Sequence, residues 1–244
     1  MKATATEFRL RFWIFVAIYW LSFSLYLFDH QNLGGWLAMN AGRLLPSLTG
    51  GVAVKIVFWL GTLLAVLGAA LRTWATGYLR PEVMVDERVH SARLVADGPY
   101  RFLRNPLYFG NMLMAFGYAV MASRVGAPVL VALHVIFLLR LIGREEAALA
   151  KTQGESYAGY CRAVPRLWPS LTPRVPAAGH PFSLGGGILG EAFFWCLALA
   201  EAVFAVTLKI KVFYWVLWAS FAVYAVCYAV IKLQRRSGDA DRAL

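Results

Sequence analysis

Six apolar runs, separated by short polar segments, divide the sequence and restrict the folds that it can adopt. The runs are residues 12–28, 52–71, 107–122, 127–142, 188–208 and 212–233. A helix needs about 20 mostly apolar residues to cross the hydrocarbon core of a bilayer, with about 17 as a practical minimum, so each run is close to the length of a span. The pattern predicts an all-α fold, a polytopic transmembrane helical bundle of about six spans.

The composition supports a membrane protein and argues against a nucleic-acid partner. Hydrophobic residues make up 60% of the chain and aromatic residues 15%, which is typical of integral membrane proteins. The net charge of +11 is high, but the Lys and Arg residues lie in short segments between apolar runs, where membrane topology explains them better. The three cysteines have neither disulfide nor metal-ligand spacing, so we expect no metal site.

The distribution of Lys and Arg predicts how the spans are oriented. With the N-terminus in the cytoplasm, five of the 24 Lys and Arg residues lie on the outer side, which leaves 19 in or beside cytoplasmic segments. The first apolar run lacks a convincing signal-peptide cleavage site, which favours a retained anchor. We therefore expect both termini in the cytoplasm, together with two polar blocks, 72–106 and 140–187.

The apolar runs and polar blocks divide the chain into five expected parts. These are N-terminal transmembrane helices with an interfacial loop (1–71), a core with a helical hairpin (72–169), a linker (170–187), a C-terminal pair of transmembrane helices (188–233) and a disordered tail (234–244). Gly110 and Gly117 lie two turns apart on one face of the third run, which predicts close packing against a neighbouring helix.

Residues 97–110, Asp-Gly-Pro-Tyr-Arg-Phe-Leu-Arg-Asn-Pro-Leu-Tyr-Phe-Gly, are the most informative part of the first polar block. The sequence Asn105-Pro106 marks a helix start, because asparagine is a good N-cap and proline suits the first helical position. Tyr108 would lie in the first turn, where free backbone N–H groups and the nearby Arg104 attract a carboxylate or phosphate. The alternative is that Asn105 only caps the helix and the arginines only reach lipid headgroups.

The second polar block begins with a helix end that carries two arginines and two acids. The fourth apolar run continues through Arg140, Arg144, Glu145 and Glu146 to a predicted stop at Gly154. Because adjacent residues point in different directions on a helix, Glu145 and Glu146 cannot both face one pocket. We expect the two polar blocks to form one site, the alternative being a solvated helix end with local ion pairs.

Three ionisable residues, His134, Glu191 and Glu201, lie inside or at the edge of apolar runs. Ionisable groups within membrane spans are candidates for function, which would suit a transporter. We expect Glu191 to reach water from the end of its span. We expect Glu201 and His134 to be satisfied by neighbouring side chains.

Several motifs follow one another between about residues 72 and 169. They are Gly98-Pro99-Tyr100, Arg104-Asn105-Pro106-Leu107-Tyr108-Phe109-Gly110, Glu145-Glu146, Gly154-Glu155-x-Tyr157-x-x-Tyr160 and Val164-Pro165-Arg166-Leu167-x-Pro169. In this order and spacing they resemble the isoprenylcysteine carboxyl methyltransferase and phospholipid methyltransferase superfamily. The first apolar run and the last two fall outside the resemblance.

The resemblance implies a membrane-embedded methyltransferase that uses S-adenosylmethionine, with both polar blocks closed over this cofactor on the cytoplasmic side. It assigns cofactor binding to Gly98, Pro99, Tyr100, Arg104, Asn105, Tyr108, Glu145, Glu146, Tyr157 and Tyr160. The catalytic candidates are Glu145, Arg140 and Arg144. The cofactor's carboxylate suits the helix start, its ammonium suits a glutamate, and its adenosine is expected near the backbone of residues 94–100.

Two positions depart from the superfamily pattern. Asn105 replaces a histidine that many members have before the proline, so no proton transfer is expected there. Leu141 occupies a position at which members that methylate a carboxylate often have arginine, and Arg140 and Arg144 flank it. The acceptor is expected to be a lipophilic small molecule or prenylated group, isoprenylcysteine carboxylate-like or phospholipid-like, that enters from the lipid bilayer. The alternative function is a non-catalytic lipid-binding or scaffold protein that keeps the fold.

Overall fold

The computed structural model describes residues 2–44, 50–79 and 96–241, and these ranges are helical, without a β-strand. The helices are α1 (Ala5–Arg9), α2 (Arg11–Ser24), η1 (Leu25–Leu27), α3 (Leu33–Leu44), α4 (Gly50–Thr76), η3 (Gly98–Arg101), α6 (Pro106–Ala119), α7 (Gly126–Ala163), α8 (Leu184–Gly190), α9 (Ala192–Thr207) and α10 (Ile210–Asp241). The predicted all-α fold is confirmed for the described part of the chain.

The apolar runs predicted from the sequence all form helices, but not all of these helices are long. Among the described residues, α4, α7 and the part of α10 up to Ala229 are long and apolar enough to cross a membrane, and the bent pair of α8 and α9 would make a fourth span. Helices α2 and α6 have 14 residues each, or about 21 Å, which is shorter than a hydrocarbon core of about 30 Å. The expected number of about six spans is not reached by this criterion.

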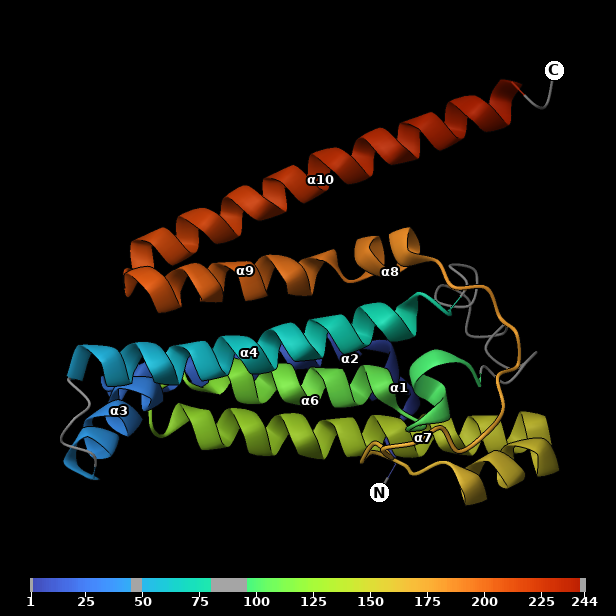
Figure 1. The fold of residues 1–244 in the computed structure, drawn as a ribbon, viewed down its shortest axis with the longest axis horizontal. Helices are drawn as coiled ribbons and strands as arrows, with labels where there is room; N and C mark the ends of the chain where they lie inside the picture. Colours follow the sequence, from blue (N-terminus) through green and yellow to red (C-terminus); the bar gives the residue numbers. More distant parts are fainter. Residues whose placement is uncertain (1, 45–49, 80–95, 242–244) are drawn as a thin grey trace.

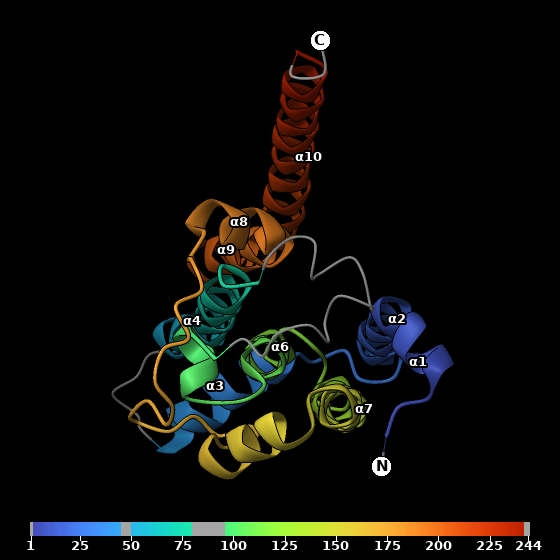
Figure 2. The ribbon, with the colours of Figure 1, turned by 90° about the vertical axis from the view of Figure 1, so that its right-hand side faces the viewer.

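Helices α4, α6 and α7 form the middle of the bundle (Figures 1 and 2). Helix α2 packs on α7, and α9 packs on α4. Helix α10 packs on α9 and otherwise leans away from the bundle (Figure 2).

Close contact between α4 and α6 depends on glycine. A Cβ atom at Gly117 would lie 2.6 Å from the carbonyl oxygen of Gly61, and one at Gly110 would lie 2.8 Å from that of Gly68. Both separations are shorter than van der Waals contact, so only glycine lets the two backbones approach this closely. The packing role predicted for Gly110 and Gly117 is confirmed.

Helix α7 reverses its direction at Gly154, where the sequence predicts a helix stop. Gly154 has φ +55° and ψ −128°, a conformation that glycine adopts easily and other residues rarely. The chain beyond the kink folds back along α7 (Figure 1). Tyr157, Tyr160 and Val164 form a small buried cluster there, against which Ala96 packs.

The described parts of both polar blocks lie at the same end of the bundle, where η3, the start of α6 and the end of α7 meet (Figure 1). The backbone N–H of Arg104 donates to the carbonyl of Pro165 at 2.9 Å, and that of Ser170 donates to the carbonyl of Phe102 at 3.0 Å. Two segments about 60 residues apart in the sequence are therefore joined by backbone hydrogen bonds.

Asp97 holds the predicted linker against η3. Its carboxylate accepts hydrogen bonds from the backbone N–H groups of Ala178, Gly179 and His180 at 2.8, 3.2 and 2.9 Å, and lies 2.6 Å from Nδ1 of His180. Burial raises the pKa of Asp97, but these hydrogen bonds outweigh it and hold the pKa below its ordinary value. The segment 170–187 is fastened to the core at this point.

Two segments form helices where a loop and a disordered tail were expected. Residues 33–44, expected within an interfacial loop, form α3, whose first N–H groups, those of Leu33 and Gly34, donate to the carbonyls of Ala122 and Val120 at 2.8 Å. Helix α10 continues to Asp241, through most of the segment expected to be a disordered tail.

Candidate active site

Tyr108 and Glu145 connect the two polar blocks. Tyr108 lies in the first turn of α6, and its hydroxyl donates to Oε1 of Glu145 on α7 at 2.6 Å. The short connection between α6 and α7 makes the two helices antiparallel, which places the start of α6 beside the distal half of α7. The expectation that the blocks come together is met by this pair.

Glu146 faces a different set of partners from Glu145, as the helix geometry predicts. Its carboxylate lies 3.1 Å from Nη1 of Arg104 and 2.8 Å from Nε of Arg166. It also accepts a hydrogen bond from Nδ2 of Asn105 at 3.2 Å. The alternative in which Arg104 only reaches lipid headgroups is wrong, because its guanidinium is held by Glu146.

Asn105 stands at the N-cap position of α6, but its side chain does not cap the helix. The side-chain amide instead donates to Glu146 and to the carbonyl of Arg166, the latter at 2.9 Å. The predicted helix start is confirmed, with Pro106 as the first helical residue, whereas the predicted capping hydrogen bond is wrong. These two hydrogen-bond acceptors of the second block turn the Asn105 amide away from the first turn of α6.

Tyr100 of η3 and the two tyrosines at the end of α7, Tyr157 and Tyr160, form a connected group. The Tyr160 hydroxyl donates to the backbone carbonyl of Tyr100 at 2.7 Å, and the rings of Tyr157 and Tyr160 are 6.1 Å apart. Burial raises the pKa of the Tyr100 hydroxyl, so this group stays neutral. Gly98 begins η3 with φ +52°, and the following Pro99 is buried. Of the residues expected to hold adenosine, 94 and 95 lie outside the described residues.

Arg140 and Arg144, two of the catalytic candidates, contact the N-terminal segment instead of Glu145. Nη2 of Arg140 lies 2.7 Å from both carboxylate oxygens of Glu7, and Nη1 of Arg144 donates to the carbonyl of Ala3 at 3.3 Å. The pKa of Glu7 is lowered to about 2, first by a backbone hydrogen bond from Thr4 and then by the Arg140 side chain.

A cleft of about 710 Å³ runs along α7 beside Glu146. Its apolar part is a stripe of α7 residues that begins with Ile136 and Leu139, both exposed on the outside of the bundle, and continues through Gly143 and Ala147. Its polar lining residues are Lys2, Arg104, Arg140, Glu146, Tyr157 and Arg166. Four cations and one acid therefore line the described cleft.

Comparisons with known proteins place this arrangement in a family. The profile of the family described as Phospholipid methyltransferase matches residues 56–156. A Protein-S-isoprenylcysteine O-methyltransferase of Schizosaccharomyces pombe is 30% identical over 163 residues, which are 58% of this chain and 67% of that protein. No solved structure matches the chain.

The chain belongs to the isoprenylcysteine carboxyl methyltransferase and phospholipid methyltransferase superfamily. Membership identifies it as a membrane methyltransferase. The matched profile covers most of α4, all of α6 and α7 to just beyond its kink, and so includes Arg104, Tyr108, Glu145 and Glu146. Helices α8, α9 and α10 lie outside it.

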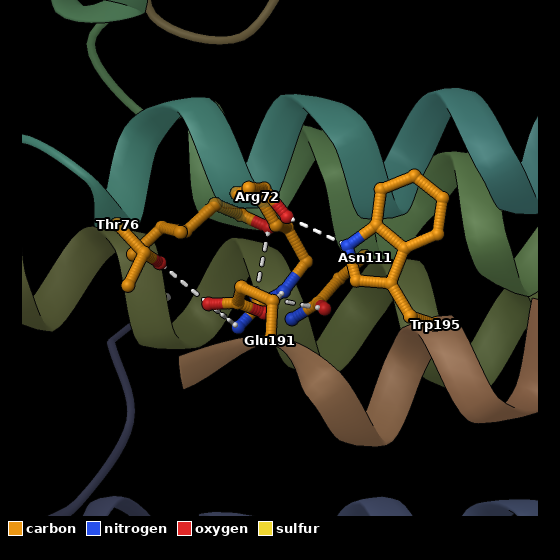
Figure 3. Close-up of polar contacts among 7 residues, drawn as sticks. Arg72, Thr76, Asn111, Glu191 and Trp195 are labelled. Carbon is orange, nitrogen blue, oxygen red and sulfur yellow. Dashed lines mark hydrogen bonds and ion pairs between the residues drawn. The ribbon is translucent and has the colours of Figure 1, made fainter. Parts of the chain in front are cut away.

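A polar cluster that was not expected from the sequence includes a residue outside the matched profile (Figure 3). Arg72 on α4 pairs with Glu191 at the start of α9, with Nε and Oε2 2.6 Å apart. The Glu191 side chain is 0% exposed, and Thr76 also donates to it at 2.5 Å. The expectation that Glu191 reaches water is wrong. The position of Arg72 at the end of a predicted span could have indicated a buried polar contact. No nearby sequence feature identifies its partner, which lies 119 residues away.

The two other ionisable residues within apolar runs are not satisfied by neighbours. Neither carboxylate oxygen of Glu201 and neither ring nitrogen of His134 has a hydrogen-bond partner among the described residues, although both side chains are buried. The expectation of satisfied neighbours is wrong for both. Neither residue lines the described cleft.

Two further buried side chains, Arg104 and Gln153, have polar atoms without protein partners among the described residues. Nε of Arg104 and both polar atoms of the Gln153 side chain are buried without a hydrogen bond in the described chain. Gln153 precedes the kink by one residue and was not among the expected site residues. Leu141, the position that often carries arginine in carboxylate methylators, is 0% exposed within the core, while Arg140 lines the cleft.

Proposed function

We propose that this methyltransferase uses S-adenosylmethionine to methylate a lipophilic acceptor with an anionic group, of which an isoprenylcysteine carboxylate is the type. The observation that carries the proposal is the cleft along α7, whose lining combines an apolar stripe with four cations and one acid. A prenyl or acyl chain suits the stripe, and a carboxylate suits the cations.

The residues around Tyr108 and Arg104 fit S-adenosylmethionine, which carries a methyl group on a positively charged sulfur. The buried Nε of Arg104 lacks a protein partner and would suit the carboxylate of the cofactor. Glu145 would suit the ammonium, and the unpartnered Gln153 amide would suit the edge of the adenine ring. Orphaned buried polar atoms are costly, so each of these unpartnered groups supports a polar ligand beside it.

The charge of the cleft favours an anionic acceptor over a phospholipid amine. A carboxylate is already a nucleophile and needs only positioning, whereas an ammonium group must first lose a proton to a base. The acid that lines the cleft, Glu146, is occupied by Arg104, Asn105 and Arg166. Arg140, which lines the cleft, is the arginine that would orient the acceptor.

The chain's own contribution to the reaction would be alignment. Holding the reacting atoms about 3 to 3.5 Å apart and in line can contribute about 7 to 11 kcal/mol to lowering the barrier. Tyr108 and Glu145 would fix one reactant from the bundle interior, and Arg140 would fix the other from the cleft. No proton transfer at Asn105 is required.

We also propose that all six apolar helices lie in the membrane, with both termini and the site on the cytoplasmic side. The short helices α2 and α6 pack against longer ones, so neighbours would cover the ends that fall short. The excess of Lys and Arg in the segments at the site end supports this orientation.

Calorimetric titration of the detergent-purified protein with S-adenosylmethionine tests the cofactor, and absence of binding at high micromolar ligand would refute the proposal. Incubation with labelled cofactor and either a prenylcysteine or a phosphatidylethanolamine then tests the acceptor. Label transfer to the prenylcysteine alone is expected. Cofactor binding without transfer to any lipid would favour the alternative of a non-catalytic protein that keeps the fold.

A further inference from the structure

The guanidinium of Arg72, on α4, makes hydrogen bonds to two other helices (Figure 3). From α4 it donates through Nε and Nη2 to Glu191 at 2.6 and 3.0 Å. Through Nη1 it donates to the carbonyl of Leu107 at 3.2 Å and to Oδ1 of Asn111 at 3.0 Å. One side chain thereby links α4, the first turns of α6 and the start of α9.

The contact on α6 lies next to a proposed site residue. Leu107 directly precedes Tyr108, and Asn111 lies one turn further along, on the face of Leu107. Tyr108 reaches Glu145 on α7. The first turn of α6 is therefore held by Arg72 on one side and by Glu145 on the other.

Glu191 fixes the orientation of Arg72. It stands at the 67° bend between α8 and α9, and its carboxylate accepts from both Arg72 and Thr76. Helix α9 is held beside them by the Trp195 indole, which donates to Thr73 at 2.9 Å. The ring of Phe194 lies 4.5 Å beneath the guanidinium.

A buried ion pair is weak support for stability, because the cost of removing two charges from water offsets most of their attraction. Its geometry is nonetheless specific, since an arginine fork donates in fixed directions. Four donations from Arg72 leave it little capacity for a ligand of its own. These properties suit a residue that orients other residues.

We infer that Arg72 and Glu191 are positioning residues that set the first turn of α6, so that α8 and α9, outside the matched profile, are part of the methyl-transfer unit. Arg72 acts through the Leu107 carbonyl on Tyr108, and Glu191 acts through Arg72. The inference rests on the proposed function for its catalytic consequence, but the positioning itself can be measured without substrates.

Hydrogen exchange of the full-length protein in detergent tests the positioning directly. In Glu191→Gln, amides 107–111 should exchange at least about fivefold faster than in the wild type, because Arg72 loses the charge that orients it. Glu201→Gln, a change at the other fully buried glutamate of this region, should leave these amides unchanged. Equal exchange of 107–111 in the wild type and Glu191→Gln would overturn the inference.

The double substitution Arg72→Glu/Glu191→Arg distinguishes positioning of α6 from simple attachment of α9 to α4. It restores opposite charges between α4 and α9, but the carboxylate placed on α4 cannot donate to the Leu107 carbonyl. In this double variant we expect the amides of α8 and α9 to regain the wild-type protection from exchange and the protein to regain its thermal stability. Amides 107–111 should still exchange faster than in the wild type. We expect kcat to stay at least about tenfold below the wild-type value, with little change in KM. Recovery of 107–111 together with α9 would show attachment alone and refute the inference.

Asn111→Leu provides a milder variant that leaves the Arg72–Glu191 pair intact. It should accelerate exchange at 107–111 without affecting α9, and unchanged exchange there would also contradict the inference. If the wild type neither binds S-adenosylmethionine nor transfers methyl groups, the proposed function fails, whereas the exchange pattern still decides the positioning.

Discussion

The hydroxyl of Tyr108 donates a 2.6 Å hydrogen bond to the carboxylate of Glu145, across 37 residues of sequence. We expect Tyr108→Phe and Glu145→Gln each to weaken S-adenosylmethionine binding by about tenfold or more, since a hydrogen bond to a charged group contributes about 1.5–3 kcal/mol. Calorimetric titration measures the change. Glu201→Gln serves as the control and should bind like the wild type, and equal losses in all three variants would indicate damaged folding.

Release of Arg140 from Glu7 should strengthen acceptor binding. The substitution Glu7→Gln removes the carboxylate to which Arg140 donates. The Arg140 guanidinium then becomes available to an anionic acceptor. We expect KM for a prenylcysteine to fall about threefold or more and the affinity for S-adenosylmethionine to stay constant. Arg140→Gln should raise the same KM. Parallel changes for cofactor and acceptor would contradict a role in acceptor binding.

The contact of Asp97 with residues 178–180 should be sensitive to acid. Because the pKa of Asp97 in the folded state lies below its ordinary value of about 3.9, the contact stabilises the fold above that value and the stabilisation is lost as the pH falls through the folded pKa. Limited proteolysis of residues 170–183 should therefore accelerate at low pH. Asp97→Asn should show fast cleavage already at neutral pH, and cleavage of this variant at the wild-type rate would refute the role of the carboxylate.

The glycines between α4 and α6 should tolerate no side chain. Gly117→Ala places a Cβ 2.6 Å from the Gly61 carbonyl oxygen and should destabilise the protein by about 1–3 kcal/mol. Gly51→Ala is the matched control, because a Cβ at Gly51 meets nothing within 4 Å and alanine favours the helix. Thermal unfolding in detergent should show a lower midpoint for the first variant and an unchanged or higher one for the second.

Replacement of the two buried glutamates of α9, one at its start and one within it, should shift the thermal midpoint in opposite directions. Glu201 lacks a hydrogen-bond partner in the described chain, whereas Glu191 is bonded to Arg72 and Thr76. Glu201→Leu should raise the thermal midpoint, since an unsatisfied buried polar group costs about 1–3 kcal/mol. Glu191→Leu should lower it, because Arg72 would be left unpaired. A lower midpoint in both variants would mean that Glu201 has an unrecognised stabilising role.

Features that depend on local sequence were predictable. The helices follow from apolar run length, the start of α6 from Asn105-Pro106, the kink of α7 from Gly154, and the different partners of Glu145 and Glu146 from helix geometry. Gly110 and Gly117 indicated a close helix contact because their spacing places them on one face.

Features that depend on long-range partners were not predictable. The side chain of Asn105 leaves its capping position for acceptors from the second block. Arg140 and Arg144 are bound by residues more than 130 positions earlier, and the partner of Arg72 comes from a segment that the motifs do not cover. Helix α3 was obscured by Gly34 and Gly35, but Gly34 packs too closely against Phe58 and the Val120 carbonyl to carry a side chain.

Helix α7 carries the exposed apolar Ile136 and the polar Glu146 on one continuous helical segment, ten residues apart. At 1.5 Å per residue the two levels are about 15 Å apart. An acceptor whose reacting group reaches the level of Glu146 therefore needs an apolar tail of about that length to stay in contact with Ile136. In the proposed function, the separation of Ile136 and Glu146 along α7 therefore sets a minimum length for the apolar tail of the acceptor. An acceptor with a shorter tail would lose its contact with Ile136 before its reacting group reached the level of Glu146.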